Sequence, residues 1–429
     1  MLFGIGIVIL IISYAFKRYH HSWFNPASIF SAIWGMILCL YSLRLFQIFY
    51  VSNASIIVFI VGIGCFLIGC IPCSFSFGAK RLYKEYEARD WSFAFSKTTR
   101  LVFMILSIFA LVILLIRAIN TIPFWAGGVA AVKQANAEGY ISYSSWLSIL
   151  YTFFANPIVT LSVFVIAVDS FFNRGAFSKL QTMLTVCMLF LGYIATGSKF
   201  SLFVPVMAFL IVYFVYKYEK KELQEEKLSV LKKISLWKKI IIVVAAIIII
   251  SFLIYMLSLK YGGWLESLYM YLVGCIPCGD HAMKNMANGT YYYGMVSLNG
   301  IFRVFSQIFA FVGIRLPYTD FMNEAYNSML IYERAINISP TVTYNAFVSA
   351  FSYFYKDGGL VGVGFGTLLF GRISHCTYRR MLQERSAYSI LLYLFVCYLI
   401  MFSIVRVQLF LAPTVMVLVY MIIFFRRRN

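Results

Sequence analysis

The sequence predicts an all-α polytopic integral membrane protein, and two observations support this prediction. Of the 429 residues, 62% are hydrophobic and only 12% are charged, whereas soluble proteins average about 45 to 50% apolar and about 25% charged residues. The apolar residues form runs that match bilayer-crossing helices, and the basic residues cluster at the ends of these runs. The net charge of +20 therefore reflects membrane topology, not nucleic-acid binding.

Eleven apolar runs qualify as transmembrane helices. They cover residues 2–16, 27–43, 55–77, 101–119, 146–168, 180–197, 200–216, 240–259, 358–374, 388–405 and 409–425. Lys17 and Arg18 follow the first run, whereas a cleavable signal peptide carries its positive charges in front. We therefore expect a retained first span with its N-terminus outside.

The distribution of basic residues sets the orientation. With the N-terminus outside and the C-terminus cytoplasmic, 25 of the 36 Lys and Arg residues lie on the cytoplasmic side and 11 lie outside. This excess is what the positive-inside rule requires. The segment 217–239 mixes Glu and Lys at helical spacings, so we interpret it as a solvated cytoplasmic tether.

This topology divides the chain into three parts. Residues 1–259 hold eight helices, residues 260–357 form a large extracytoplasmic loop, and residues 358–429 hold three more helices. A loop this long is usually functional. Inside it, residues 296–314 read as an amphipathic helix, which we interpret as interfacial. The alternative is a twelfth span, which would move Arg426 to Arg428 outside.

The segment that begins at Asn345, itself a candidate for substrate binding, places polar residues directly against a span. Its aromatic stretch of about a dozen residues is shorter than the roughly 20 that a crossing helix needs, so we expect it to dip into the membrane and return. Lys356, Asp357, Gly358 and Gly359 then break the pattern before the run 358–374. Asp357 is the first candidate for a catalytic base. The alternative role is an N-cap for the helix that follows.

Several cations on the predicted outer side suit a phosphate-containing ligand. Lys199 follows Ala-Thr-Gly-Ser, whose small residues let backbone amides approach an anion as well. The other candidates are Arg117, Arg303, Arg315 and Arg334. The competing interpretation for each is an interfacial side chain that extends its charge to water.

Further acid and base candidates are Asp280, His281 and Glu324. Asp280 and His281 are adjacent, and an acid/base pair there is one interpretation. The Cys-Ile-Pro-Cys segments at 70–73 and 275–278 have zinc-like internal spacing. The topology places them on opposite sides of the membrane, so we expect no shared metal site, and a disulfide at 275/278 is the alternative.

These motifs together resemble those of bacterial oligosaccharide repeat unit polymerases, the O-antigen polymerase family. The resemblance lies in Asn25-Pro26, in Thr196-Gly-Ser-Lys199, in Asn345 and in Asp357-Gly358-Gly359. Lysine stands at 199 where the family has arginine, which keeps the charge but loses the bidentate geometry. Gly358 stands where the family usually has an aromatic residue. At positions 199 and 358, the roles of the family's residues therefore do not transfer directly to this chain.

The resemblance implies a multi-pass enzyme of the bacterial inner membrane, with a GT-C-like arrangement as one option. Such an enzyme joins undecaprenyl-diphosphate-linked oligosaccharides outside the cytoplasm, with lipid-linked glycans as donor and acceptor, and builds O-antigen or capsule. It implies metal-independent transfer without a cofactor, and a flippase and a chain-length regulator of the same pathway as partners. Aromatic residues of the outer loop could stack on sugars, and the candidates are Tyr291 to Tyr293, Tyr344, Tyr353 and Tyr355.

Other functions remain open at this point. An O-antigen ligase or another polyprenyl-phosphate-dependent glycosyltransferase would use similar chemistry. A lipid-linked oligosaccharide flippase would place charges inside its spans, which here are nearly free of charge. A transporter would be expected to show inverted repeats or broken spans in matching halves, and none is evident.

Overall fold

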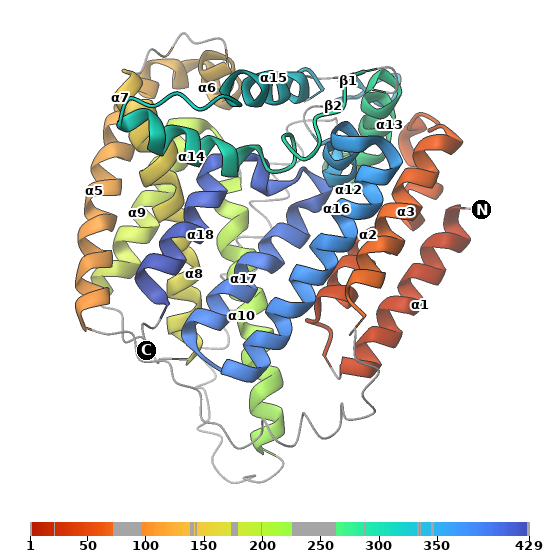
Figure 1. Cartoon of the computed structure of the whole chain (residues 1–429), viewed down its shortest axis with the longest axis horizontal. Helices are drawn as coiled ribbons and strands as arrows, with labels where there is room; N and C mark the ends of the chain where they lie inside the picture. Colours follow the sequence, from red (N-terminus) through yellow and green to blue (C-terminus); the bar gives the residue numbers. More distant parts are fainter. Residues whose placement is uncertain are drawn as a thin grey trace.

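The computed structural model describes residues 2–20, 22–71, 97–137, 141, 144–172, 179–198, 200–224, 263–286, 289–332, 334, 336–344 and 347–426. These residues are almost entirely helical, and five of their helices are long and apolar enough to cross a membrane (Figure 1). The five are Leu2–His20, Lys97–Gly127, Ser145–Phe172, Lys179–Thr196 and Ala387–Ile404. Shorter apolar helices are Pro26–Ser42, Asn53–Gly69, Phe203–Lys217 and Ala412–Phe425. An all-α protein with membrane-crossing helices is the class that the sequence predicted.

The first helices, α1 (Leu2–His20) and α2 (Pro26–Ser42), form a close antiparallel pair. A Cβ atom at Gly6 would lie 2.5 Å from Cys39 Sγ, so glycine is needed at this contact. Asn25 begins α2 as its N-cap, accepting a hydrogen bond from the Ser28 amide at 2.8 Å, and Pro26 occupies the first turn. The Asn25-Pro26 motif is therefore a helix start.

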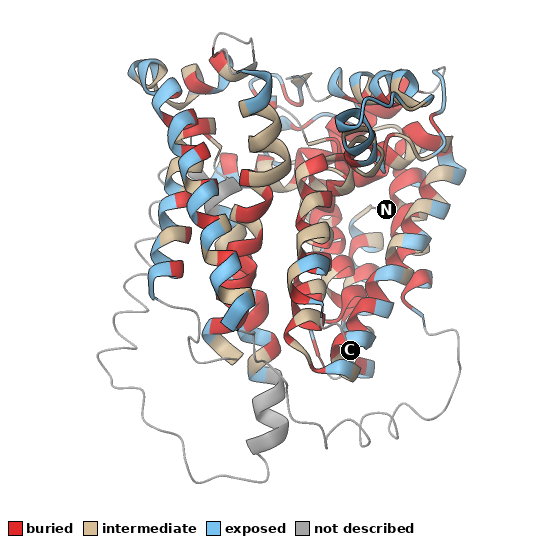
Figure 2. Cartoon of the chain, turned by 60° about the vertical axis from the view of Figure 1, so that its left-hand side comes forward, coloured by how far each residue is buried: buried red, intermediate tan, exposed pale blue. Residues whose placement is uncertain are grey.

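A second group of helices packs beside the first (Figure 1). It consists of α5 (Lys97–Thr121), η2 (Ile122–Gly127), α6 (Gly128–Ala137), α7 (Ser145–Leu150), the π-helical turn η3 (Tyr151–Ala155), α8 (Asn156–Phe172), α9 (Lys179–Thr196), α10 (Phe200–Gln224), α17 (Ala387–Met401) and α18 (Ala412–Phe425). The outer faces of α5 and α9 are exposed (Figure 2) and carry large apolar side chains such as Val112 and Phe190. Exposed apolar faces of this kind suit contact with lipid.

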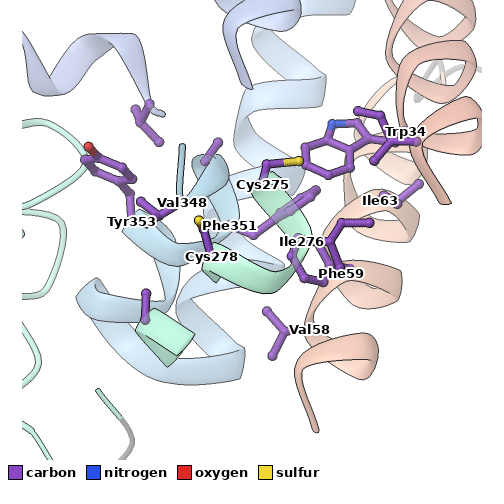
Figure 3. Close-up of a cluster of buried hydrophobic side chains, with 14 of the residues drawn as sticks. Trp34, Val58, Phe59, Ile63, Cys275, Ile276, Cys278, Val348, Phe351 and Tyr353 are labelled. Carbon is purple, nitrogen blue, oxygen red and sulfur yellow. The ribbon is translucent and has the colours of Figure 1, made fainter. Parts of the chain in front are cut away.

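Each helix group has its own hydrophobic core. The first core joins α2 and α3 (Asn53–Gly69) to α13 (Cys275–Met286) and α16 (Ser349–Glu384). Figure 3 shows its centre, where Phe351 packs edge-on against Phe59. The second core lies among α5, α8, α10, α17 and α18. A hydrogen bond of 3.2 Å from Trp34 Nε1 to Ser403 Oγ, in the turn η4 (Phe402–Ile404), joins the two groups.

A layer of short elements lies across one end of the bundle (Figure 1). It consists of α12 (Trp264–Val273), α13 (Cys275–Met286), α14 (Asn299–Phe311), α15 (Thr319–Leu330), β1 (Ile336–Asn337) and β2 (Thr343–Tyr344). The two strands form an antiparallel hairpin that pairs Ile336 with Tyr344. The backbone amide of Phe49, in the connection between α2 and α3, bonds to Ile338 at 2.9 Å and ties this hairpin to the bundle.

Helix α16 (Ser349–Glu384) is broken at Gly358 and Gly359 and folds back on itself. A Cβ atom at Gly362 would lie 2.4 Å from the carbonyl oxygen of Phe354, and one at Gly366 would touch the Phe354 ring. A straight helix would separate residues eight apart by about 12 Å. The aromatic segment therefore turns back at the glycines, as the sequence predicted.

Close packing explains some of the glycines in the run 358–374. Gly362 and Gly366 lie against Phe354, whereas Gly364 has only ordinary contacts. Gly371 adds a closer approach, since a Cβ atom there would lie 2.1 Å from the carbonyl oxygen of Phe66 on α3. Small residues let the backbones of α3 and α16 touch at this crossing.

Most predicted spans coincide with helices of the structure. The run 409–425 differs, because η5 (Gln408–Phe410) precedes the helix, and α18 begins only at Ala412. The run 240–259 lies outside the described residues, and the run 55–77 is described only to residue 71. The number and orientation of the spans stay predictions.

Candidate functional site

The break in α16 places Asp357 beneath the start of the segment that leads into α14. Its carboxylate accepts hydrogen bonds from the backbone amides of Val296 and Ser297, each at 2.9 Å. Asp357 is 6% exposed. It therefore does not cap its own helix but binds the amides of another segment, which resembles an N-cap supplied from a distance.

The neighbouring residue, Lys356, and the carboxylate of Glu324 both contact Tyr292. The Lys356 ammonium lies 5.3 Å from the centre of the Tyr292 ring, and the Tyr292 hydroxyl donates a hydrogen bond of 3.0 Å to Glu324 Oε1. Glu324 itself is exposed on α15. We call Asp357, Lys356, Tyr292 and Glu324 the α16 cluster. It lies where the helical bundle meets the layer of short elements.

Burial shifts the pKa values of two residues of this cluster. Burial raises the pKa of Asp357, and hydrogen bonds from Ser297, Val296 and Gly294 offset part of that rise. Burial lowers the pKa of Lys356, while the nearby carboxylate of Glu324 opposes this change. Perturbed groups of opposite sign that lie together are typical of functional sites.

Two tyrosines border the α16 cluster. A Cβ atom at Gly359 would lie 2.9 Å from the Tyr291 hydroxyl, so this ring covers the break in the helix. Tyr293 is 85% exposed and adopts a left-handed backbone conformation with φ 49°, and its amide donates to the carbonyl of Asp357 at 2.9 Å. Such strain in a non-glycine residue concentrates at functional sites. An exposed ring at this position could stack on a sugar.

Among the predicted cations, Arg303 lies in a stack that holds α15. Its guanidinium lies 4.1 Å from the centre of the Tyr326 ring, and Tyr326 stacks on Phe410 of η5 at 4.9 Å. Tyr326 is two residues after Glu324 on α15. The stack therefore fixes the helix that carries Glu324.

The other described cations have different surroundings. The Arg117 guanidinium is buried 3.9 Å from the centre of the Tyr151 ring. Arg315 forms an exposed ion pair with Asp320, and Arg334 is exposed. Tyr344 is 0% exposed and packs against Tyr271 and Phe347, so it presents no face to a sugar.

Asp280 and His281 point to different partners. Asp280 accepts hydrogen bonds from the amide and hydroxyl of Ser52, at 2.9 and 2.6 Å, and forms an ion pair with Lys284 at 2.7 Å. His281 Nε2 lies 3.1 Å from the side-chain amide of Asn285. Asp280 thus ties α13 to the start of α3. The adjacent thiols of Cys275 and Cys278 are free and buried, so the disulfide at 275/278 is not formed.

Two predicted ligand-binding residues, Lys199 and Asn345, lie outside the described residues. The residues before Lys199 are described and form a tight turn, in which Gly197 has a φ of 62°. A Cβ atom at Gly197 would lie 3.4 Å from the side chain of Lys133 on α6. The Thr-Gly-Ser motif therefore lies beside a second cation, Lys133, which is exposed.

Asp357 and Glu324 were predicted as site residues from the sequence. Lys356 was recognised only as part of the break before the run 358–374, and Tyr292 only as a candidate for sugar stacking. Lys356 and Tyr292 lie close to Glu324 only because α16 folds back on itself and because α15 packs over this region. Lys356 could have been found from its position directly before Asp357-Gly358-Gly359, since a charge beside a break in an apolar segment is unusual.

The comparisons with known proteins find no match to this chain among protein-family models, curated proteins or solved structures.

Proposed function

We propose that the chain is a membrane-embedded glycosyltransferase that polymerises lipid-linked oligosaccharides outside the cytoplasm. The α16 cluster supports this proposal best, because it brings an exposed carboxylate, a nearly buried ammonium and a buried carboxylate to the border between an apolar bundle and a polar layer. A lipid-linked glycan has its reacting diphosphate at the same border. The motif resemblance to O-antigen polymerases points to the same chemistry.

The proposed topology has eleven spans, the N-terminus outside, the C-terminus in the cytoplasm and a GT-C-like arrangement. In this orientation the layer of α12 to α15 lies on the outer side. The exposed Glu324 then faces the compartment where lipid-linked repeat units are joined. The excess of basic residues at the opposite end of the helices supports this orientation.

The proposed reaction needs a base and a partner for the leaving group. A hydroxyl of the acceptor glycan attacks the anomeric carbon of the donor, the bond from that carbon to the diphosphate breaks, and the hydroxyl proton passes to a carboxylate. Glu324 is the proposed base, because it is exposed whereas both oxygens of Asp357 accept backbone amides. Asp357 is then a positioning residue that holds Tyr291 to Ser297 against the cluster.

The leaving diphosphate requires cations. Lys356 is the nearest to the proposed base, and Lys133 with Lys199 supplies a second group at the Thr-Gly-Ser turn. Arg303 and Arg117, whose guanidinium groups are stacked on tyrosines, are further proposed ligands of the diphosphate. Arg315 contributes less in this proposal, because Asp320 already neutralises it.

Replacement of Glu324 by Gln tests the proposal. Gln keeps an oxygen that accepts from Tyr292 but cannot take a proton, so long-chain glycan should fall by about a hundredfold or more, the lower range for general base catalysis. Asp320→Asn is the matched control, because Asp320 is an exposed carboxylate one turn earlier on α15. It should polymerise like the wild type. Equal chain lengths in the Glu324→Gln variant would refute the assignment of the base.

The lipid-linked glycans of a host that lacks this gene distinguish the polymerase from its closest alternative. Loss of a polymerase leaves single repeat units on the lipid, whereas loss of an O-antigen ligase leaves complete chains that are not attached to their final acceptor. Accumulation of single units is expected here. Repeat units that stay on the cytoplasmic face would instead indicate a flippase.

A further inference from the structure

The outward side of α14 is an exposed apolar surface. Phe305, Ile308 and Val312 are exposed and recur at helical spacings of three and four residues, so they share one side of the helix. Phe309 and Phe311 widen this surface. A helix face that is exposed to water would carry polar residues at such positions.

The opposite side of α14 is already occupied. A Cβ atom at Gly300 would lie 2.5 Å from the carbonyl oxygen of Leu409, so the helix rests directly on the turn before α18. Asn299 donates to the carbonyl of Met322 on α15 at 2.9 Å, and Ser306 lies 3.4 Å from the hydroxyl of Thr319. The helix therefore cannot turn its apolar side inward without breaking these contacts.

The apolar side of α14 continues onto a helix that can cross a membrane. The rings of Phe311 and Trp146 lie 6.1 Å apart, and Trp146 is the second residue of the candidate span Ser145–Phe172. Figure 1 shows α14 across the ends of the bundle helices and next to α7. Tryptophan at the end of a span usually lies at the level of the lipid headgroups. This contact places α14 at the same level.

We infer that α14 lies in the membrane interface, with Phe305, Ile308, Phe309 and Val312 against lipid acyl chains and Trp146 with Phe311 at the headgroup level. Its 13 residues extend over about 20 Å, which is short of the roughly 30 Å hydrocarbon core. It therefore lies along the interface and does not cross. The inference does not depend on the proposed glycosyltransferase activity.

Spin labels on single cysteines test the inference in vesicles of phosphatidylethanolamine and phosphatidylglycerol. Labels at Phe305, Ile308 and Val312 should collide with oxygen several-fold more often, relative to a water-soluble nickel chelate, than a label at Asn323. Asn323 is exposed on α15 and serves as the water-facing control. Val112, exposed and apolar on α5, serves as the lipid-facing control.

Nickel accessibility at the three α14 positions equal to that at Asn323 would overturn the inference. Spin–spin broadening there would also overturn it, since it would indicate that a second copy covers the face. A second measurement avoids the removal of native cysteines. Trp146 fluorescence, taken as the difference between the wild type and Trp146→Phe, should be quenched by lipids that carry bromine near the headgroup, and unchanged emission would contradict the inference.

Discussion

Gly358 and Gly359 are adjacent but differ in how much space each leaves for a side chain. Gly358 has φ −170°, which any residue adopts, and no atom lies within 4 Å of a Cβ placed there. Gly359 has φ 61° and ψ −147°, a region that is essentially restricted to glycine, and a Cβ atom there would meet the Tyr291 hydroxyl.

Gly359→Ala should therefore destabilise the fold by about 1 to 3 kcal/mol, the usual cost of a residue held in a disfavoured backbone region. Gly358→Ala is the matched control and should leave stability nearly unchanged. Thermal unfolding of the two variants in detergent measures the difference. Equal melting temperatures would show that the break in α16 does not depend on the glycine at 359.

Asp357→Asn tests whether the carboxylate is needed as a double acceptor. Asn supplies one oxygen, so one of the buried amides of Val296 and Ser297 would face a donor in place of an acceptor. A buried donor without an acceptor costs about 1 to 3 kcal/mol. Stability and glycan length should fall together in this variant, as measured by thermal unfolding and gel analysis. Shortened glycan with unchanged stability would instead give Asp357 a direct chemical role.

Among the elements, α13 is joined to the start of α3 by the charged carboxylate of Asp280. Burial alone would raise the pKa of Asp280, but hydrogen bonds from Lys284 and Ser52 outweigh it and lower the pKa. A lowered folded-state pKa gives stability that is present above the usual value of about 3.9 and is lost as the pH falls through the folded pKa. The joint should therefore weaken only below about pH 4.

The pH dependence of unfolding provides the measurement for Asp280. The wild type should lose melting temperature in acid more steeply than Asp280→Asn, which has no charge at this position to lose. At neutral pH the variant should be the less stable protein, because Asn cannot form the ion pair with Lys284. Parallel profiles of the two proteins would mean that Asp280 is not titrated in the joint.

Local sequence patterns were sufficient to predict most elements. Apolar runs predicted the helices of the bundle, and the Asp357-Gly358-Gly359 break predicted a segment that turns back, because these signals act between neighbouring residues. The short helices α12, α13 and α15 were not predicted, because their 10 to 12 residues are too few to stand out as apolar runs of the length that marks a span.

At the scale of the whole molecule, the orientation in the membrane is the main prediction. A cysteine introduced at Asn323 should react with a membrane-impermeant maleimide in intact cells, because the layer of short elements lies outside in the proposed topology. A cysteine at Glu225 should react only after lysis. The reverse pattern would invert the topology and remove the proposed function with it.

The candidate site could be predicted only as separate residues. Asp357 and Glu324 were singled out as acids, but Glu324 meets Tyr292 across 32 residues, and no sequence spacing reports that contact. Asp280 and His281 are neighbours in the sequence and were considered as an acid/base pair. Adjacent residues of a helix point in different directions, and these two contact different partners. Tyr344 was a stacking candidate, yet the hairpin places it in the core.

The bonds from Asp357 to residues 60 and 61 positions earlier have a consequence for biosynthesis. A ribosome makes Val296 and Ser297 well before their acceptor exists, so the segment that leads into α14 cannot complete its hydrogen bonds until α16 has been synthesised and inserted. The layer of short elements therefore completes its structure late in translation. Nascent chains stalled before residue 357 should be cut by protease within residues 289–298, and chains stalled after the complete α16 should resist.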